Sequence, residues 1–278
     1  MEPEINTDID LRGALEWYSA MGVDLAVGDE PIDHFAAKKP EVTTPQQSSS
    51  VPAAIGAPLS APASPQATPA QSHAQPASHN VEEAQELSSS AKSLEELRAV
   101  MENFDGCPLK HRATNLVFGE GKHDAQVMFV GEAPERDEDM QGQPFVGRTG
   151  DLLSRMLSSI GLNRENIFIA NALPWRPPGN RNATPAETAV CLPFLNRQIE
   201  LVAPDIIITL GGGSSKTLFN TTDGILRLRG KWRELEAGKH KCQAMATLHP
   251  AYLLKQPAQK ALVWKDLLSL KAKIAEQK

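Results

Sequence analysis

The chain contains few residues of several types, and these shortages narrow its class. Among 278 residues there are three cysteines, and aromatic side chains make up 5%. So few cysteines exclude a scaffold stapled by several disulfides. No apolar run approaches the roughly 18 residues of a membrane span, and the acidic N-terminus lacks the basic, then apolar, pattern of a secretory signal. We therefore expect a soluble, cytoplasmic protein with reduced thiols that does not bind a membrane.

Charge is divided unevenly along the chain. The net charge of −6 would normally count against nucleic acid as a partner. Residues 1–90, however, hold 3 basic and 13 acidic side chains, which leaves 25 basic and 21 acidic side chains for residues 91–278. The C-terminal part is thus mildly basic, and its charge is compatible with a nucleic-acid partner.

Composition predicts three regions. Residues 1–35 have apolar side chains at near-helical spacing, which predicts a small N-terminal helical segment. Residues 36–90 are rich in Ala, Pro, Ser and Gln and predict a flexible linker, because little apolar surface offsets the entropy of ordering. Ser93 and Glu96 fit a helix capping box at the start of the third region, residues 91–278, which we expect to be the main folded domain.

Beyond residue 107, apolar runs bounded by Gly, Pro and Asn alternate with amphipathic segments, which is typical of an α/β fold. We expect three layers, α/β/α, around a central four-stranded, mostly parallel sheet. A polar or glycine-rich segment follows each apolar run that we expect to be a strand. In an open α/β sheet the carboxyl ends of the strands form the ligand crevice. The predicted strands are 127–130, 167–171, 206–210 and 243–248, and the predicted helices are 150–160, 185–202, 214–218 and 262–275.

Three residues in these loops are candidates for ligand binding, and each has an alternative structural role. Phe145, in an otherwise polar loop over residues 131–147, is either a core side chain or a platform for a planar ligand. Asn171 follows a predicted strand and is either a turn former or an amide that pairs with the edge of a base. His249 also follows a predicted strand, where a single His is more often structural.

Several segments together form one pattern: Gly131–Pro134 with Glu138 and Asp139, Gly142–Gly147 with Gly150, Asn171 with Arg176–Arg181, Leu210–Gly211, Leu228–Trp232, His249–Leu254 and Val263–Leu267. Their combination and order resemble the family-four uracil-DNA glycosylases, which implies that residues 91–278 are a catalytic domain of that kind. The resemblance covers about residues 100–272 and leaves out the first ninety. It implies hydrolysis of the N-glycosidic bond of a flipped-out deoxyuridine, which releases uracil and leaves an abasic site in base-excision repair of DNA.

The resemblance also implies roles for individual residues of the uracil site. An Asn amide donates to uracil O4 and accepts from N3–H, whereas cytosine reverses both polarities, and such a mismatch supports discrimination of about 10⁴ to 10⁵. Glu132 and Ala133 would line the site, Phe145 would stack on the base, Asn171 would read its edge, Glu138 would shape the pocket, and His249 would sit at the uracil carbonyl.

Catalysis would need stabilisation of an anionic uracil leaving group and an oxocarbenium-like sugar. A hydrogen-bond donor from His249 to uracil O2 would act like an oxyanion hole, worth about 3 kcal/mol. A carboxylate, Glu132 or Asp139, would orient water or favour the sugar cation, and the sequence leaves open which of them does so.

Basic residues and the N-terminal segment suggest partners. The DNA-contact candidates are Arg176, Arg181, Arg229 and Lys231; the segment around Trp232 either contacts phosphates and supplies a wedge or is a solvated basic hairpin. Uracil-containing DNA is the expected partner of a monomeric protein. Residues 1–35 either bind a protein partner or fold back on the catalytic domain.

Two departures from the family pattern matter. The family holds an iron–sulfur cluster on four cysteines, and this chain has Phe104, Cys107, Trp175 and Cys191 at those positions. Because two thiolates do not satisfy such a cluster, we predict that the cluster is absent, that no metal or other cofactor replaces it, and that Phe104 and Trp175 fill the space. Glu135 also replaces a family Gly, where a left-handed backbone would strain it.

These departures keep an alternative function open. A non-catalytic descendant that binds DNA or uracil, and serves as a repair or replication interaction module, would tolerate both of them. A nucleotide-handling enzyme is a third reading, suggested by Gly211–Lys216, but that segment does not match the phosphate-binding loop pattern.

Overall fold

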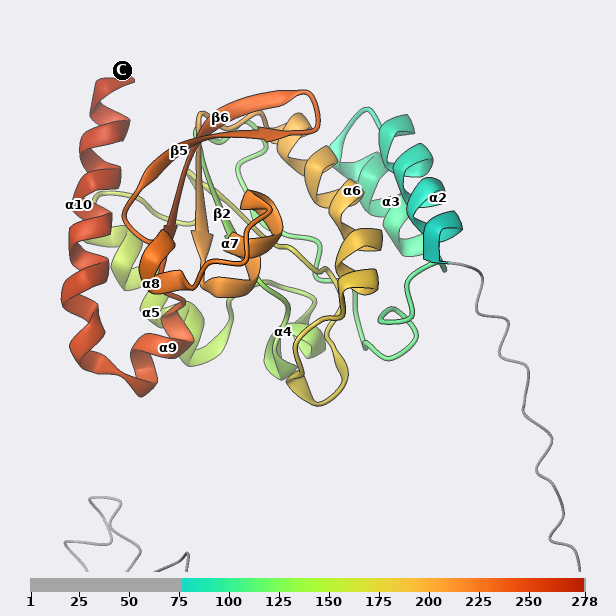
Figure 1. The fold of residues 1–278 in the computed structure, drawn as a ribbon, viewed down its shortest axis with the longest axis horizontal. Coiled ribbons are helices and arrows are strands. Elements are labelled where there is room, and N and C mark those ends of the chain that lie inside the picture. The colour runs from blue at the N-terminus through green and yellow to red at the C-terminus, as the bar shows by residue number, and fades with distance from the viewer. Residues whose placement is uncertain (1–76, 278) are drawn as a thin grey trace, which may run out of the picture. The chain divides into compact units, whose positions relative to one another are not determined.

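A six-stranded sheet forms the centre of the computed structural model, which describes residues 77–277 (Figure 1). Its strand order is β1-β3-β2-β4-β6-β5. The four inner strands are parallel to one another, and the two edge strands pair antiparallel to their neighbours. The strands are β1 Glu120–Gly121, β2 Val127–Gly131, β3 Phe168–Asn171, β4 Ile206–Leu210, β5 Trp232–Ala237 and β6 His240–Thr247.

Helices cover both faces of the sheet and give the expected three layers (Figure 1). On one face α2, α3 and α6 pack over Met128, Val130 and Ile207, and on the other α5, α9 and α10 pack over Phe129 and Ile208. The helices are α2 Ala77–Ser90, α3 Leu94–Asn103, α4 Arg136–Gln141, α5 Gly147–Ser158, α6 Pro185–Val202, α7 Gly212–Phe219, α8 Ile225–Leu228, α9 Pro250–Lys255 and α10 Lys260–Glu276, with short 3₁₀ turns at Pro178–Asn180 and Pro257–Gln259.

The sequence predicted the α/β class and the four inner strands, but the expected number of strands was too small. Both edge strands were missed for local reasons. β1 is two residues long and includes a glycine, and β5 (WRELEA) has three charged residues among six, which obscure its apolar side. A six-residue helix, α4, also stands where an acidic loop was expected.

The predicted linker was too long at its C-terminal end. Residues 77–90 form α2, which packs against α6. Its inward side chains include Ala84, which is fully buried, and such small residues make its apolar stripe hard to distinguish from linker composition. The start of α3 was predicted correctly, because the Ser93 hydroxyl accepts from the Glu96 amide. The predicted helical segment 1–35 and linker residues 36–76 lie outside the described residues.

The carboxyl ends of the four parallel strands meet at one edge of the sheet. The strand order explains the crevice there. β2 is the first of the four parallel strands in the chain, and β3 and β4 lie on its two sides, so the connections diverge at β2. The loops after β2, β3, β4 and β6 therefore converge, and each carries one of the segments singled out from the sequence.

Candidate active site

A cleft of about 370 Å³ opens at this edge of the sheet. Glu132 and Ala133 reach it from the loop after β2, and His249 from the loop after β6. Asn171 and Phe145 are not among the lining residues and are buried, 4% and 2% exposed. The remaining lining residues are Pro134, Glu135, Pro177, Asn180, Arg181, Asn182 and Lys255.

Phe145 is held in a strained conformation. Its φ of 54° is left-handed, which is rare for a side chain of this size. Glu138 accepts from its amide at 2.8 Å, and Arg164 donates to its carbonyl at 3.1 Å. A Cβ at Gly150 would collide with the same carbonyl. These contacts fix the ring 5.4 Å from that of His249, with the two planes inclined by 33°.

Asn171 ends β3 beside Phe145. A Cβ at Gly131 would collide with its Oδ1 and crowd the Phe145 ring, so the three residues share one tightly packed corner. The Asn171 Nδ2 is buried and has no hydrogen-bond partner within the described residues. An enclosed donor without an acceptor costs free energy. Its presence here is consistent with a ligand that supplies the missing acceptor.

The tautomer of His249 is set by the backbone. Its Nδ1 accepts from the Ala251 amide at 3.2 Å and caps the start of α9. The neutral ring therefore carries its proton on Nε2, which is the nitrogen left to donate. Burial lowers the pKa of His249 to about 4, because enclosure disfavours the charged ring. At neutral pH the residue is an uncharged donor.

Glu132 lies against the glycine-rich turn that begins α7. A Cβ at Gly213 would collide with the Glu132 carboxyl group, so only glycine leaves room for it there. The turn Gly211–Gly213 starts a helix tightly, as the sequence indicated, and it also makes space for a carboxylate at the cleft.

The two carboxylates of α4 have different surroundings. Glu138 receives the amides of Phe145 and Glu135, and burial raises its pKa to about 7. Its hydrogen bonds tie the start of α4 to the Phe145 backbone. Asp139 is not among the residues that line the cleft: its carboxylate accepts from Thr114 and Asn115 and fixes their loop.

The DNA-contact candidates differ in exposure and in bonding partners. Arg181 lines the cleft and pairs with Glu187, which lowers the pKa of that carboxyl to about 2. Arg176 donates to Asn180, and Lys231 is exposed. The Arg229 guanidinium is largely buried and bonded to Asp266.

Trp232 does not project as a wedge, since its indole donates to Ser269 on α10. Asp266 was missed as a site-supporting residue. Besides pairing with Arg229 it accepts from Thr247, two residues before His249. It therefore joins α10, the segment after α8 and the strand that carries His249. The only sequence signal was its place in the Val263–Leu267 motif.

Glu135 is compatible with the loop. Its φ of −85° is ordinary for any residue, and its amide donates to Glu138 as the N-cap of α4. The strain expected from replacing a glycine is absent. Glu135 adds a carboxylate to the cleft wall instead.

Comparison with known proteins identifies the family. The model of the "Uracil DNA glycosylase superfamily" matches residues 118–268. A type-4 uracil-DNA glycosylase of Archaeoglobus fulgidus is 42% identical over 170 residues, which cover 60% of this chain and 85% of that protein. Those of Thermotoga maritima and Sulfurisphaera tokodaii are 40% and 38% identical, over 62% and 64% of this chain and 89% and 84% of theirs.

The chain belongs to the uracil DNA glycosylase superfamily. Within it, the four positions that the resemblance assigns to cluster cysteines form a packed apolar region. Phe104 and Trp175 are buried, as predicted, in the same cluster of side chains as Cys107 and Cys191. The Phe104 ring meets Phe194 edge-on at 5.0 Å.

Cys107 and Cys191 are close together. Their Sγ atoms lie 3.8 Å apart, and both thiols are buried. Two large aromatic side chains fill the other two ligand positions, so these residues do not fit a four-thiolate cluster.

Among residues 77–277 no helix has the length and apolarity to cross a membrane.

Proposed function

We propose that this chain is a uracil-DNA glycosylase that excises uracil from DNA by hydrolysis and does so without an iron–sulfur cluster. The observation that carries this function is the buried, unpartnered Nδ2 of Asn171 beside Phe145 and His249. Membership of the superfamily supports the same reaction.

Base recognition would fall to Asn171 and Phe145. The Asn171 Nδ2 would donate to uracil O4, which satisfies the buried donor, and Oδ1 would accept from N3–H. The Phe145 ring would stack on the extruded base. Cytosine presents a donor and an acceptor in the reverse order and would leave both Asn171 groups unpaired, so it would be rejected. The nucleotide must first leave the duplex stack, at a cost of a few kcal/mol.

His249 would stabilise the leaving group. As the glycosidic bond breaks, negative charge develops on the uracil ring and O2. The neutral imidazole would donate Nε2–H to O2, with its orientation fixed by the Ala251 amide on the opposite nitrogen. One donor of this kind is worth about 3 kcal/mol of transition-state stabilisation.

Glu132 is the carboxylate that we assign to the sugar. It lines the cleft, whereas Asp139 is occupied by the Thr114 loop. The Glu132 side chain would favour the oxocarbenium-like sugar and orient the water that attacks C1′. Attack of water at C1′ breaks the C–N bond, and uracil leaves with the bonding electron pair and is then protonated.

The cluster-free part of the proposal rests on packing. Phe104 and Trp175 are buried among side chains of α3, α6 and the loop after β3. Their packing would hold these elements together in place of a cluster. No step of the reaction requires a metal in this scheme.

Uracil release from single-stranded and U·G duplex oligonucleotides, read by alkaline cleavage at abasic sites, tests the proposal. We expect release by the full chain and its loss in Asn171→Ala and in His249→Ala. No release by the folded, DNA-binding wild type would instead favour a non-catalytic member of the superfamily, and Glu135→Gly would then be the first reversion to make.

A further inference from the structure

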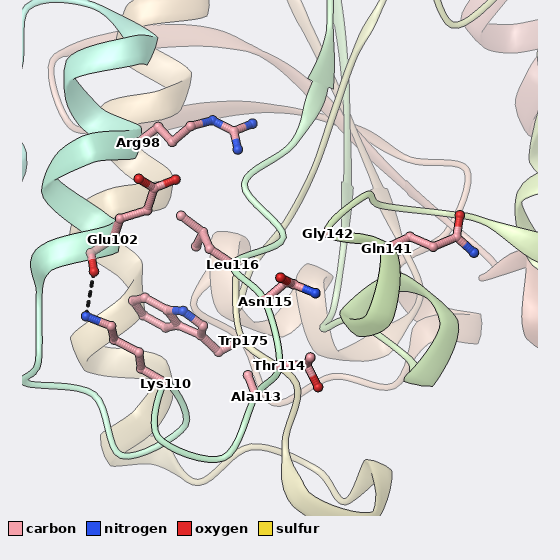
Figure 2. Close-up of a pocket in the computed structure, with 10 residues that line it drawn as sticks. All are labelled: Arg98, Glu102, Lys110, Ala113, Thr114, Asn115, Leu116, Gln141, Gly142 and Trp175. Carbon is pink, nitrogen blue, oxygen red and sulfur yellow. Dashed lines mark hydrogen bonds between the residues drawn. The ribbon is translucent and has the colours of Figure 1, made fainter.

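The loop Gly142–Gly147, which carries Phe145, is attached to its surroundings on one side by side-chain amide and carboxyl groups. At the start of the loop, the Asn115 amide donates to two carbonyls in the last turn of α4, and Figure 2 shows this amide directed at that helix end. Within the loop, Glu138 accepts from the Phe145 amide. These contacts do not involve the carbonyl groups of Pro144 and Phe145.

A single guanidinium, that of Arg164, binds both of these carbonyl groups. Its Nη2 donates to the Pro144 carbonyl at 2.7 Å and its Nη1 to the Phe145 carbonyl at 3.1 Å. The planar fork of arginine suits two acceptors that lie side by side. Phe145 has the left-handed φ of 54°, and a strained backbone of this kind persists only where surrounding contacts enforce it. Arg164 therefore acts at the residue that most needs an external contact.

Arg164 is placed by a tight turn between α5 and β3. The Asn163 side chain accepts from the amides of Glu165 and Asn166, and the Asn166 side chain accepts from the Asn163 amide. These reciprocal bonds close the turn around Arg164. The origin of the guanidinium is thus fixed by local sequence.

Glu120 orients the guanidinium from β1, the edge strand that the sequence did not predict. Its carboxylate accepts from the Arg164 Nε at 2.5 Å, and the two side chains are 28% and 29% exposed. β1 pairs with β3, and a Cβ at Gly121 would collide with the Ile167 carbonyl oxygen, so only glycine permits this close approach. β1 therefore supplies the counter-charge of Arg164.

We propose that Arg164, oriented by Glu120, is a positioning residue for base recognition. It holds the Phe145 backbone in its left-handed conformation and so keeps the ring where the uracil stacks. Neither Arg164 nor Glu120 lines the cleft, so both act through Phe145 and do not touch the base. The inference rests on the proposed function, since it names the residues that position a side chain of the same site.

Hydrogen exchange of the loop is the first readout, and it needs no activity. Arg164→Met keeps an unbranched apolar side chain and removes every donor. In the full chain, amides of residues 142–147 should exchange at least about tenfold faster in this variant than in the wild type, because the loop opens more often. Glu120→Ala should have a smaller effect. The double variant should match Arg164→Met, because Glu120 acts only through Arg164.

Affinity for free uracil is the second readout, measured by calorimetry and as inhibition of uracil release from a single-stranded oligonucleotide. For Arg164→Met the inhibition constant and KM should rise about tenfold or more. The value of kcat should fall less, because His249 is held separately by the Ala251 amide. Affinity for a uracil-free oligonucleotide, from fluorescence anisotropy, should not change. Arg164→Lys should restore only part of the loss, because an ammonium lacks the fork that reaches three acceptors.

Arg197→Met is the matched control. Arg197 also donates to a backbone carbonyl, that of Ala91, and pairs with Glu200, and these two side chains are 23% and 17% exposed. It lies near the end of α6, just before β4 begins, and so at the edge of the sheet opposite the cleft. Thermal unfolding should show a similar loss of stability in Arg164→Met and Arg197→Met, but Arg197→Met should keep wild-type loop exchange and uracil affinity.

The proposal is overturned if Arg164→Met leaves loop exchange and uracil affinity unchanged, or if Arg197→Met changes both equally. It is also overturned if Arg164→Met weakens binding of uracil-free DNA by the same factor, which would make Arg164 a phosphate contact. If Arg164→Met does not fold, Glu120→Ala decides by the same readouts. If the wild type neither binds nor releases uracil, the proposed function fails, and loop exchange alone decides whether Arg164 holds Phe145.

Discussion

The rings of Phe145 and His249 lie 5.4 Å apart and are inclined by 33°. The first is held by a strained backbone and the second by a helix cap, so the proposed stacking surface and the proposed donor are fixed relative to each other before DNA binds. Preorganisation of this kind reduces the reorganisation that the reaction needs.

Replacing His249 tests the donor. His249→Ala should lower kcat by about 10² to 10³-fold, the usual effect of losing one such donor. It also removes a helix cap, at about 1 kcal/mol of stability. Ser93→Ala removes the cap of α3, far from the cleft, at a similar cost and should leave single-turnover uracil release unchanged. Equal activity losses in both variants would indicate general destabilisation.

The pH dependence of His249 follows from its lowered pKa. With a folded-state pKa of about 4 and an unfolded one near 6.5, the unfolded chain binds a proton that the fold does not between these values. His249 therefore lowers stability as the pH falls from about 6.5 to 4. Urea unfolding at a series of pH values should show a shallower acid loss for His249→Gln than for the wild type, and identical slopes would contradict the assigned pKa.

Asn171 should matter for activity and not for stability. Asn171→Leu keeps a similar volume and removes the unpaired donor, so the free energy of unfolding should stay equal or rise while uracil release is lost. Gln198→Leu is the contrast: that buried amide donates to Phe118, and its loss should cost about 1–3 kcal/mol without abolishing release. Marked destabilisation by Asn171→Leu would mean that its amide is already satisfied.

Gly213 should control the position of Glu132. Gly213→Ala places a methyl group where the Glu132 carboxyl group lies, so we expect kcat/KM to fall at least about tenfold, or 1.4 kcal/mol in transition-state binding. The fold should survive, because the end of a flexible side chain can move. Gly224→Ala is the matched control, since a Cβ there meets no atom. Full activity of Gly213→Ala would remove Glu132 from the mechanism.

Asp266→Asn should be strongly destabilising. It leaves the Arg229 guanidinium, 14% exposed, without its counter-charge, at a cost of about 2–4 kcal/mol in chemical unfolding. Glu236→Gln breaks the exposed pair with Lys241 and should cost less than about 1 kcal/mol. Similar costs for the two variants would argue against a buried ion pair at Asp266.

The parallel strands and α6 were predictable because they are continuous apolar or periodic segments with clear boundaries. α2 was not, because its buried side chains are small and its composition matches the linker before it. β5 was not predictable either, because three of its six residues are charged, and such a composition is as typical of an exposed loop as of a strand.

Several site residues were predictable from the motifs, but the direction of each side chain was not. Glu138 and Asp139 are adjacent in the sequence, and successive residues on a helix point about 100° apart. Only Glu138 faces Phe145, and Asp139 turns to the loop at Thr114. The partner of Arg229 was not predictable for a related reason: a basic segment does not reveal which of its cations has a buried partner.

The central claim is uracil excision without an iron–sulfur cluster, and one preparation tests it directly. The full chain is purified anaerobically, its iron, sulfide and visible absorbance are measured, and uracil release is assayed on the same sample before and after treatment with a strong iron chelator. The account predicts substoichiometric iron and sulfide, no cluster absorbance, and uracil release that the chelator does not change. Stoichiometric iron and sulfide, with release that disappears when the iron is removed, would contradict it.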